Sequence, residues 1–228
     1  MKAIAILGDF DSTNLRHLAT QSAIRHSADR LDSAVEGKWI ATEEISPSLL
    51  ADFAGIWVSP GSPYKDMKRV LRAIGYARKE NVPCFGTCGG FQHMVLEYAH
   101  NVLNFEDARH AEYDPYASDL YISKLACSLV GREMRLSFVP ESIVARAYGA
   151  LTAIEEYYCN FGVNPEKVGI LRNSPLRITG SDAEGEVRAI ELPSHPFFVG
   201  TLFVPQMRST ADKPHPLVNA FLRAVADT

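Results

Sequence analysis

The first half of the chain alternates short apolar runs with longer segments whose apolar residues recur at helical spacing. Residues 2–8, 53–61 and 82–88 are typical of buried strands, whereas residues 14–28 and 66–80 have the periodicity of helices. Because strands and helices of these lengths alternate, the strands are expected to run parallel, with helices on both faces of the sheet. The sequence therefore predicts a doubly wound α/β core. A further strand is expected at residues 37–45 and a further helix at residues 89–103.

The second half, beyond about residue 105, has a different pattern, in which short β-type runs are separated by turn residues. Such strands would extend the parallel core into a mixed sheet. No linker, internal repeat or low-complexity tract divides the chain, so residues 1–228 are expected to form a single domain. The expected strands are residues 124–130, 132–139, 157–164, 169–182, 186–192 and 198–205, and a last helix is expected at residues 216–227.

Composition and charge narrow the classes of function. A chain of 228 residues with 46% hydrophobic residues can bury one sizeable core. Its formal net charge of −4 comes without a basic cluster, which argues against nucleic acid as a partner. The apolar start of the chain is too short for a signal peptide or a spanning helix, so we expect a cytoplasmic protein that does not bind membranes.

The cysteines are Cys84, Cys88, Cys127 and Cys159, and their spacing does not form the paired C-x-x-C clusters of a metal site. Disulfides are uncommon in cytoplasmic proteins, so all four are expected to be free thiols. Cys84 lies in an apolar run and is expected to be a buried strand residue, since free cysteine packs like a small hydrophobe. No metal and no cofactor is predicted.

Cys88 stands in the stretch "PCFGTCGGFQ", where a buried strand is expected to pass directly into a helix. Glycines beside a nucleophile permit the tight strand-to-helix turn that presents a catalytic side chain at the carboxyl end of a sheet. The start of the helix would lower the pKa of the thiol and could hold an oxyanion. The alternative is a glycine-rich turn that binds an anion or packs tightly.

Longer stretches resemble the class I glutamine amidotransferase domain, and within that family the glutaminase domain of CTP synthase. They are "FAGIWVSPGSPYKD", "AIGYARKENVPCFGTCGGFQ", "YYCNFGVNP" and "HPFFVGTLFVPQMRS", which follow the family's order nearly from end to end. The resemblance implies a three-layer, flavodoxin-like α/β fold, with a mostly parallel central sheet and added antiparallel strands. It also implies hydrolysis of the side-chain amide of glutamine by a Cys-His-Glu triad.

The resemblance implies roles for particular residues. Cys88 matches the nucleophile, and the N–H groups of Gly89 and of the loop at Gly61 match the oxyanion hole. Gln92 matches a glutamine that contacts the substrate, and Glu112 matches an acidic residue that receives the substrate's amino group.

The sequence departs from the family where the rest of the triad and the carboxylate clamp are expected. The family's H-P-E is Val204-Pro205-Gln206 here, so the triad histidine and glutamate are replaced by Val204 and Gln206. The arginine that binds the glutamine carboxylate matches Asn160, which offers hydrogen bonds but no charge. Pro63 stiffens a loop that is rich in glycine in the family. A standard glutaminase is therefore not expected.

Two hypotheses remain open. In the first, the chain is a cysteine-nucleophile hydrolase or amidotransferase that acts on a C–N bond of a small molecule with a different base. His93 and His110 are candidates for that base, although each could equally be a packed or solvated histidine, and His195 gives no evidence for one. Glu112 could assist, but an ionised carboxylate raises the pKa of a thiol. In the second, the chain is a non-catalytic pseudoenzyme or regulatory module that binds a small molecule in the old glutamine pocket.

The expected partners follow from these hypotheses. The ligand would be a small nitrogen-containing molecule, and Tyr157, Tyr158 and Phe161 could line its site unless they simply cover the sheet. The chain starts directly at its first strand and carries no synthetase or P-loop segment. Any ammonia it makes would need a separate acceptor, and the chain could also form a homo-oligomer.

Overall fold

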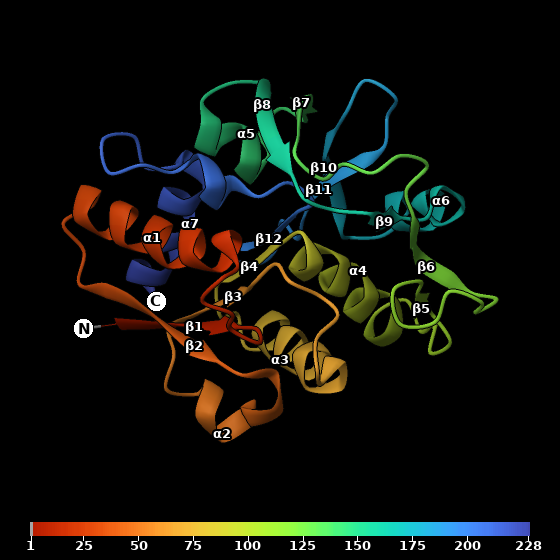
Figure 1. The fold of residues 1–228 in the computed structure, drawn as a ribbon, viewed down its shortest axis with the longest axis horizontal. Helices are drawn as coiled ribbons and strands as arrows, with labels where there is room; N and C mark the ends of the chain where they lie inside the picture. The colour runs from red at the N-terminus through yellow and green to blue at the C-terminus, as the bar shows by residue number, and fades with distance from the viewer. Residues whose placement is uncertain (1) are drawn as a thin grey trace.

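The fold is that of a computed structural model, which describes residues 2–228. Its centre is a nine-stranded sheet in the order β2-β1-β3-β4-β12-β11-β10-β7-β8 (Figure 1). A smaller sheet has the order β5-β6-β9. The strands are β1 Lys2–Leu7, β2 Val35–Ile40, β3 Gly55–Val58, β4 Cys84–Thr87, β5 Arg109–His110, β6 Leu120–Lys124, β7 Arg132–Phe138, β8 Thr152–Tyr157, β9 Phe161–Val163, β10 Arg177–Ser181, β11 Val187–Glu191 and β12 Phe198–Thr201.

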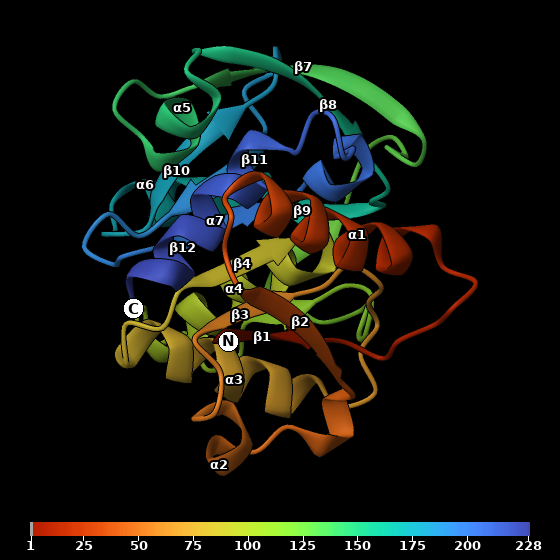
Figure 2. The same cartoon turned by 90° about the vertical axis from the view of Figure 1, so that its left-hand side faces the viewer.

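Helices cover both faces of the parallel part of the large sheet. Helices α1 and α7 pack together on one face, and α3 and α4 pack together on the other (Figures 1 and 2). The chain ends meet beside this sheet, because Lys2 Nζ donates to the carbonyl of Ala226 at 2.8 Å. The three-layer α/β prediction is thus confirmed. The helices are α1 Leu15–Arg30, α2 Pro47–Leu50, α3 Met67–Lys79, α4 Gly89–Asn101, α5 Ile143–Tyr148, α6 Val168–Arg172 and α7 Pro216–Asp227.

Strand β4 lies at the centre of the parallel part. Cys84 is in register with Ile56 of β3 on one side and with Phe198 of β12 on the other, and both neighbours run parallel to β4. All residues of β3, β4 and β12 are buried, as expected for strands covered on both faces. The segments that follow these strands therefore meet at one edge of the sheet, where open α/β sheets bind their ligands.

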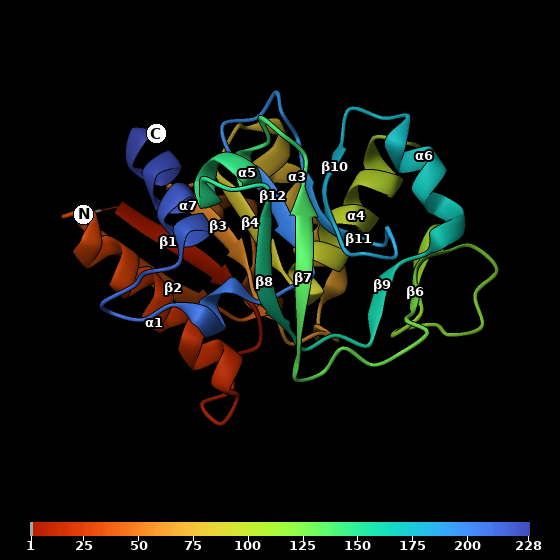
Figure 3. The same cartoon turned by 90° about the horizontal axis from the view of Figure 1, so that it is seen from above.

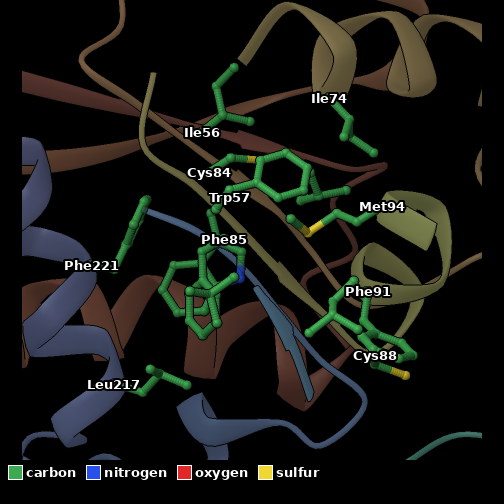
Figure 4. Packing of buried hydrophobic residues seen from close by; sticks show 14 of the residues in the cluster. Ile56, Trp57, Ile74, Cys84, Phe85, Cys88, Phe91, Met94, Leu217 and Phe221 are labelled. Atoms are coloured by element: carbon green, nitrogen blue, oxygen red, sulfur yellow. The ribbon is translucent and has the colours of Figure 1, made fainter. Parts of the chain in front are cut away.

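The main core lies between these strands and the helices. The rings of Trp57 and Phe85 have centroids 4.8 Å apart, and Phe221 of α7 packs against both (Figure 4). Figure 4 shows Cys88 beside Phe91 at the rim of this cluster, with its sulfur directed away from the other labelled side chains. The end of β4 is therefore packed into the core, and the Cys88 sulfur is directed away from the other labelled core side chains.

The remaining strands extend the sheet on the far side of β12. The pairs β12–β11, β11–β10, β10–β7 and β7–β8 are antiparallel, and β8 forms the outer edge beside β7 (Figure 3). These are the added antiparallel strands that the resemblance implied. Within residues 2–228, no helix combines the length and the apolar character that crossing a bilayer requires.

Three of the strands expected in the second half of the chain depart most from the structure. Of the expected strand at residues 124–130, only Lys124 lies in a strand, as the last residue of β6. Residues 125–130 form a loop, which bonds instead to the segment after β8. Residues 157–164 are divided between β8 and β9, which belong to different sheets. Residues 169–182 begin in helix α6. A helical turn precedes α6, and Asn164 caps this turn, because its Oδ1 accepts the N–H of Glu166.

Candidate active site

The turn from β4 to α4 presents Cys88 at the edge of the sheet. Cys88 has φ of 53° and ψ of −107°, and its N–H donates to the carbonyl of Thr201 at 2.8 Å. The turn is close to β3, since a Cβ on Gly90 would lie 2.1 Å from the carbonyl oxygen of Val58. Only glycine fits there, which accounts for the "CGG" sequence at this corner. The strand-turn-helix geometry expected of this stretch is present.

The predicted site residues come together around one cavity of about 230 Å³. Gly61, Cys88, Gln92, Glu112 and Asn160 all line it. Gly89 lies at the same place, because a Cβ on it would be 2.8 Å from Ser62 Oγ, the hydroxyl of the facing loop. The geometry thus gathers the residues that the resemblance named, while their catalytic and binding roles stay predictions.

The loop that would supply the oxyanion hole is held from α1. Gly61 has φ of +106°, a conformation that favours glycine. Beside it, His17 Nε2 donates to the carbonyl of Pro60 at 3.0 Å, and His17 Nδ1 accepts the N–H of Asp11 at 3.0 Å. Both ring nitrogens are engaged and burial lowers the pKa of His17, so a neutral imidazole holds the loop in place.

His93, the first candidate base, is likewise engaged on both sides. Its Nδ1 donates to the carbonyl of Gly89 at 2.7 Å, and its Nε2 accepts the hydroxyl of Tyr113 at 3.0 Å. The Tyr113 hydroxyl in turn accepts the N–H of Tyr64 at 2.7 Å. Burial lowers the pKa of His93 to about 4, so the ring is neutral near pH 7. The histidine connects the start of α4 to the loop that carries Tyr64.

His110, the second candidate base, forms another closed chain of hydrogen bonds. Its Nδ1 accepts the N–H of Glu112 at 3.1 Å, so its Nε2 carries the proton and donates to Gln92 Oε1 at 3.0 Å. Gln92 Nε2 then donates to the carbonyl of Phe161 at 2.8 Å. Burial lowers the pKa of His110 to about 2. His110 therefore fixes the orientation of Gln92 and has no free nitrogen for Cys88.

Glu112 is the acidic group of the cavity. Burial raises the pKa of its carboxyl, and the hydroxyl of Ser62 partly offsets that rise. Its Oε2 is buried and has no hydrogen-bond partner within residues 2–228. A carboxylate in this condition gains from a cationic or amine-bearing ligand, which would supply the missing donor.

Val204 and Gln206, which the resemblance aligns with the family's triad histidine and glutamate, are packed into the protein. Val204 is fully buried, and its N–H donates to the carbonyl of Glu156 at 2.9 Å. Gln206 Nε2 donates to the hydroxyls of Thr20 and Thr87, each at 3.2 Å. Among residues 2–228, no histidine nitrogen is hydrogen-bonded to Cys88 Sγ. The described side chains thus give this sulfur no imidazole partner.

The expectation that all four cysteines are free thiols is wrong. The structure pairs Cys88 with Cys159 as a disulfide, with their Cα atoms 6.2 Å apart, whereas Cys84 and Cys127 are free. The connection between β8 and β9 crosses the carboxyl end of β4, which brings Cys159 against Cys88 across 71 residues of sequence. A compartment argument could not anticipate that contact.

Arg16, which the sequence analysis did not single out, also lines the cavity. Its guanidinium lies over the ring of Tyr158, 5.0 Å from the centroid, and it forms no ion pair with any carboxylate of residues 2–228. Its position in the first turn of α1, at the edge where the parallel strands end, could have suggested it. Tyr158 and Phe161 line the cavity as expected, but Tyr157 is fully buried outside it.

Two other kinds of site are relevant among the described residues, a metal site and a second cavity. Across residues 2–228, no three His, Cys, Asp or Glu side chains cluster in a way that could hold a metal ion. A larger cavity, of about 1020 Å³, lies beside α5 and α7 and contains none of the predicted site residues. The chemistry suggested by the sequence is therefore assigned to the smaller cavity at Cys88.

Comparison with known proteins finds CTP synthases as relatives. The CTP synthase of Herpetosiphon aurantiacus is 30% identical over 98% of this chain, and that of Sulfurisphaera tokodaii is 34% identical over 98%. Each match covers 45% of the relative, so the chain spans less than half the length of these proteins.

Solved structures share the fold. The glutaminase domain of Trypanosoma brucei CTPS with bound acivicin has a TM-score of 0.91 at 24% identity, and the match covers 100% of this chain and 95% of that one. A glutamine amidotransferase from Thermotoga maritima has a TM-score of 0.61 at 9% identity, and the match covers 99% of this chain and 96% of that one. The family model "Glutamine amidotransferase class-I" matches residues 17–224. The chain therefore belongs to the class-I glutamine amidotransferase family.

Proposed function

We propose that the chain is a cysteine-dependent hydrolase or amidotransferase that acts on a C–N bond of a small nitrogen-containing molecule. The observation that carries this proposal is the position of Cys88, at a strand-to-helix turn that opens into the cavity lined by Gly61, Gln92 and Glu112. A nucleophile, a loop whose backbone borders the cavity and an acidic group around one small volume are the parts of an amide-cleaving site.

In the proposed reaction, the reduced Cys88 thiolate attacks the carbon of the C–N bond. The start of the 13-residue helix α4 favours the thiolate, and the N–H groups of Gly61 and Gly89 would hold the oxyanion. Glu112 would receive an amino group of the ligand, while Gln92, fixed by His110, would contact its body. The oxyanion then collapses, the C–N bond breaks, and the leaving nitrogen takes a proton from water. Water hydrolyses the thioester that remains, which releases the acid and restores the Cys88 thiol.

The charge pattern of the cavity suits a zwitterionic ligand. Asn160 carries no charge, but Arg16 lines the same cavity without an ion-pair partner among the carboxylates of residues 2–228. We assign to Arg16 the binding of a ligand carboxylate, and to Glu112 the binding of an amine. A small amino acid carrying an amide or a related group fits both.

This enzyme would not be a standard glutaminase. The leaving nitrogen needs a proton, and the places of the expected histidine and glutamate are taken by Val204 and Gln206, which bond elsewhere. Loss of a triad base costs several orders of magnitude in turnover, because the triad works as a unit. Slow turnover, or turnover of a substrate with a better leaving group, follows from this geometry.

A second function is favoured by the disulfide. With Cys88 bonded to Cys159, the sulfur cannot attack a ligand, yet Glu112, Gln92 and Arg16 still line the cavity. In that state the chain would bind a small molecule without turning it over, as a pseudoenzyme or regulatory module. For the catalytic function, we also propose that a separate protein accepts any ammonia or that the chain forms a homo-oligomer.

Turnover by the reduced protein distinguishes the two functions. Ammonia release from glutamine, asparagine and small amides is measured for the wild type, Cys88→Ser and Cys127→Ser. The catalytic proposal predicts slow release that Cys88→Ser abolishes and that Cys127→Ser, a change at an exposed thiol outside the cavity, leaves intact. Equal release by the wild type and Cys88→Ser would refute catalysis by Cys88. No release together with tight amino-acid binding would support the binding module.

The same assay tests Arg16. Arg16→Gln is expected to raise the KM for a carboxylate-bearing substrate about tenfold or more, since a charge-assisted hydrogen bond is lost. Arg25→Gln is the matched control, because Arg25 is an exposed residue of the same helix outside this cavity. An unchanged KM in Arg16→Gln would show that the carboxylate binds elsewhere or is absent from the substrate.

A further inference from the structure

Two cysteine sulfurs face each other inside the candidate active site. Cys88 and Cys159 both line the cavity, and their Cα atoms are 6.2 Å apart, within the range that a disulfide spans. The backbone fixes both residues. The N–H of Cys88 donates to the carbonyl of Thr201 at 2.8 Å, and the carbonyl of Cys159 accepts the N–H of Leu129 at 3.0 Å. The pairing therefore follows from the fold of two strand ends.

The neighbourhood of Cys88 suits redox chemistry better than proton transfer. Amide cleavage needs a group that protonates the leaving nitrogen, and no imidazole of residues 2–228 is bonded to the sulfur. Reduction of a hydroperoxide needs a thiolate, a leaving oxygen that water can protonate and a second thiol to complete the cycle. Cys88 at the start of α4 and Cys159 beside it supply both thiols.

We propose that Cys88 and Cys159 form a reversible dithiol–disulfide pair that reduces small hydroperoxides, with Cys88 as the attacking and Cys159 as the resolving thiol. The class of substrate is ROOH, and the reductant that resets the pair is an external dithiol. This activity goes beyond amide chemistry and uses a second sulfur that amide cleavage does not need.

Two steps at sulfur complete the oxidation. The Cys88 thiolate attacks the outer oxygen of the hydroperoxide, so an S–O bond forms, the O–O bond breaks, and the released alkoxide takes a proton from water. Cys88 is now a sulfenic acid, oxidised by two electrons, and the hydroperoxide is reduced to an alcohol. Cys159 then attacks the Cys88 sulfur, so that the S–S bond forms, the S–O bond breaks, and hydroxide leaves as water with the Cys159 proton. An external dithiol reduces the disulfide and becomes a disulfide itself.

The other cysteines are not equivalent. Cys84 is fully buried in β4, and burial raises the pKa of its thiol far above the usual range, so it is inert. Cys127 is exposed and free, without a paired sulfur among residues 2–228. Cys127 therefore measures how fast an ordinary thiol of this chain oxidises, which makes it the internal reference for Cys88.

A second consequence concerns control of the site. Closing the disulfide occupies the sulfur that stands at the strand-to-helix turn, so any reaction of Cys88 with a C–N bond stops until the pair is reduced. The hydroperoxide level would then decide whether the cavity holds a reactive thiolate or only binds its ligand.

The test uses the full chain, reduced with dithiothreitol, freed of reductant and treated with one equivalent of hydrogen peroxide. Peptides are analysed by mass spectrometry without reduction, in the presence of dimedone, which traps sulfenic acid. The proposal predicts the linked Cys88–Cys159 peptide as the main product in the wild type and in Cys127→Ser, and its loss on renewed reduction. It also predicts about tenfold more dimedone adduct on Cys88 in Cys159→Ser, where nothing resolves the sulfenic acid.

Two results would overturn the proposal. One is oxidation of Cys88 and Cys127 at the same rate with no linked peptide in the wild type. The other is equal dimedone labelling of Cys88 in the wild type and Cys159→Ser. Cys159→Ala serves as a second variant, and circular dichroism shows that both variants are folded. Ammonia release is not a readout here, so failure of the amide chemistry leaves this test unaffected.

Discussion

Gly90 shows how much of the site depends on single residues. A Cβ at this position would lie 2.1 Å from the Val58 carbonyl oxygen, which belongs to strand backbone and cannot move without disturbing β3. Gly90 thereby lets α4 start directly against the sheet. This close approach is what places Cys88 at the edge of the sheet and its sulfur in the cavity.

Gly90→Ala is expected to lower the free energy of unfolding by about 3 kcal/mol or more, because the added methyl group clashes with backbone. The control is Gly169→Ala in α6, where a Cβ would meet nothing within 4 Å. That change is expected to be neutral or to stabilise by up to about 1 kcal/mol, as alanine is the better helix former. Urea unfolding measures both. Equal stability of the two variants would contradict the described packing of α4 on β3.

For single residues, the sequence indicated Cys88 and the residues around it. It did not indicate that Arg16 and Cys159 line the same cavity. The strand, the glycines and the family motifs all surround Cys88 in the sequence, so local patterns sufficed to place it. Cys159 contacts Cys88 across 71 residues, and no local pattern reports a contact between distant segments. Arg16 is distinguished only by the cavity it faces, which the sequence does not show.

Helix α4 and the loop before α3 are joined through the ring of His93. The hydrogen bonds run from the N–H of Tyr64 to Tyr113, from Tyr113 to His93, and from His93 to the carbonyl of Gly89. A proton on His93 Nε2 would break this chain, because that nitrogen must accept from Tyr113. The two elements that border the cavity are therefore coupled to the protonation of one buried imidazole.

The unfolding free energy is expected to fall as the pH drops. The pKa of His93 is lowered to about 4 in the folded state, whereas the unfolded chain has an ordinary histidine pKa near 6.5. The unfolded state therefore binds the proton first. This difference in pKa contributes about 3 kcal/mol to the unfolding free energy above pH 6.5. The contribution is lost as the pH falls toward 4.

Urea unfolding at pH 7 and pH 4.5 of the wild type and of His93→Gln checks this expectation. Glutamine can accept from Tyr113 but does not titrate, so His93→Gln should lose clearly less stability between the two values. His26→Gln, a change at a half-buried histidine of α1, is the control and should follow the wild type. If His93→Gln leaves the pH dependence of the unfolding free energy unaltered, His93 is not a neutral ring that is hydrogen-bonded at both nitrogens.

Most elements of the first half were predictable because their patterns are long and periodic, whereas the four-residue helix α2 was missed. The final helix was also predicted with its bounds, residues 216–227. In the second half, α5 and α6 were missed because each is short; Ser142 caps α5, and Asn164 caps the 3-10 turn that precedes α6. The expected strand at residues 37–45 is shorter, since β2 ends at Ile40 and Thr42–Glu44 is a short 3-10 helix.

At the scale of the whole molecule, a family fold brings the predicted site residues to one edge of the sheet. The nine-stranded sheet places the ends of β3, β4 and β12 together, and the segments that follow these strands carry Gly61, Cys88, Val204 and Gln206. The resemblance was enough to predict this arrangement. The single-domain organisation and the cytoplasmic location stay predictions.

The central claim is that reduced Cys88 is a reactive thiolate activated by the start of α4 without an imidazole partner. The direct measurement is the rate of alkylation of Cys88 and Cys127 by iodoacetamide as a function of pH, followed by peptide mass spectrometry on the reduced protein. We predict that Cys88 reacts near neutral pH with one ionisation clearly below that of Cys127, and that His93→Gln leaves this ionisation unchanged. Alkylation of Cys88 that follows Cys127 at every pH would contradict the claim.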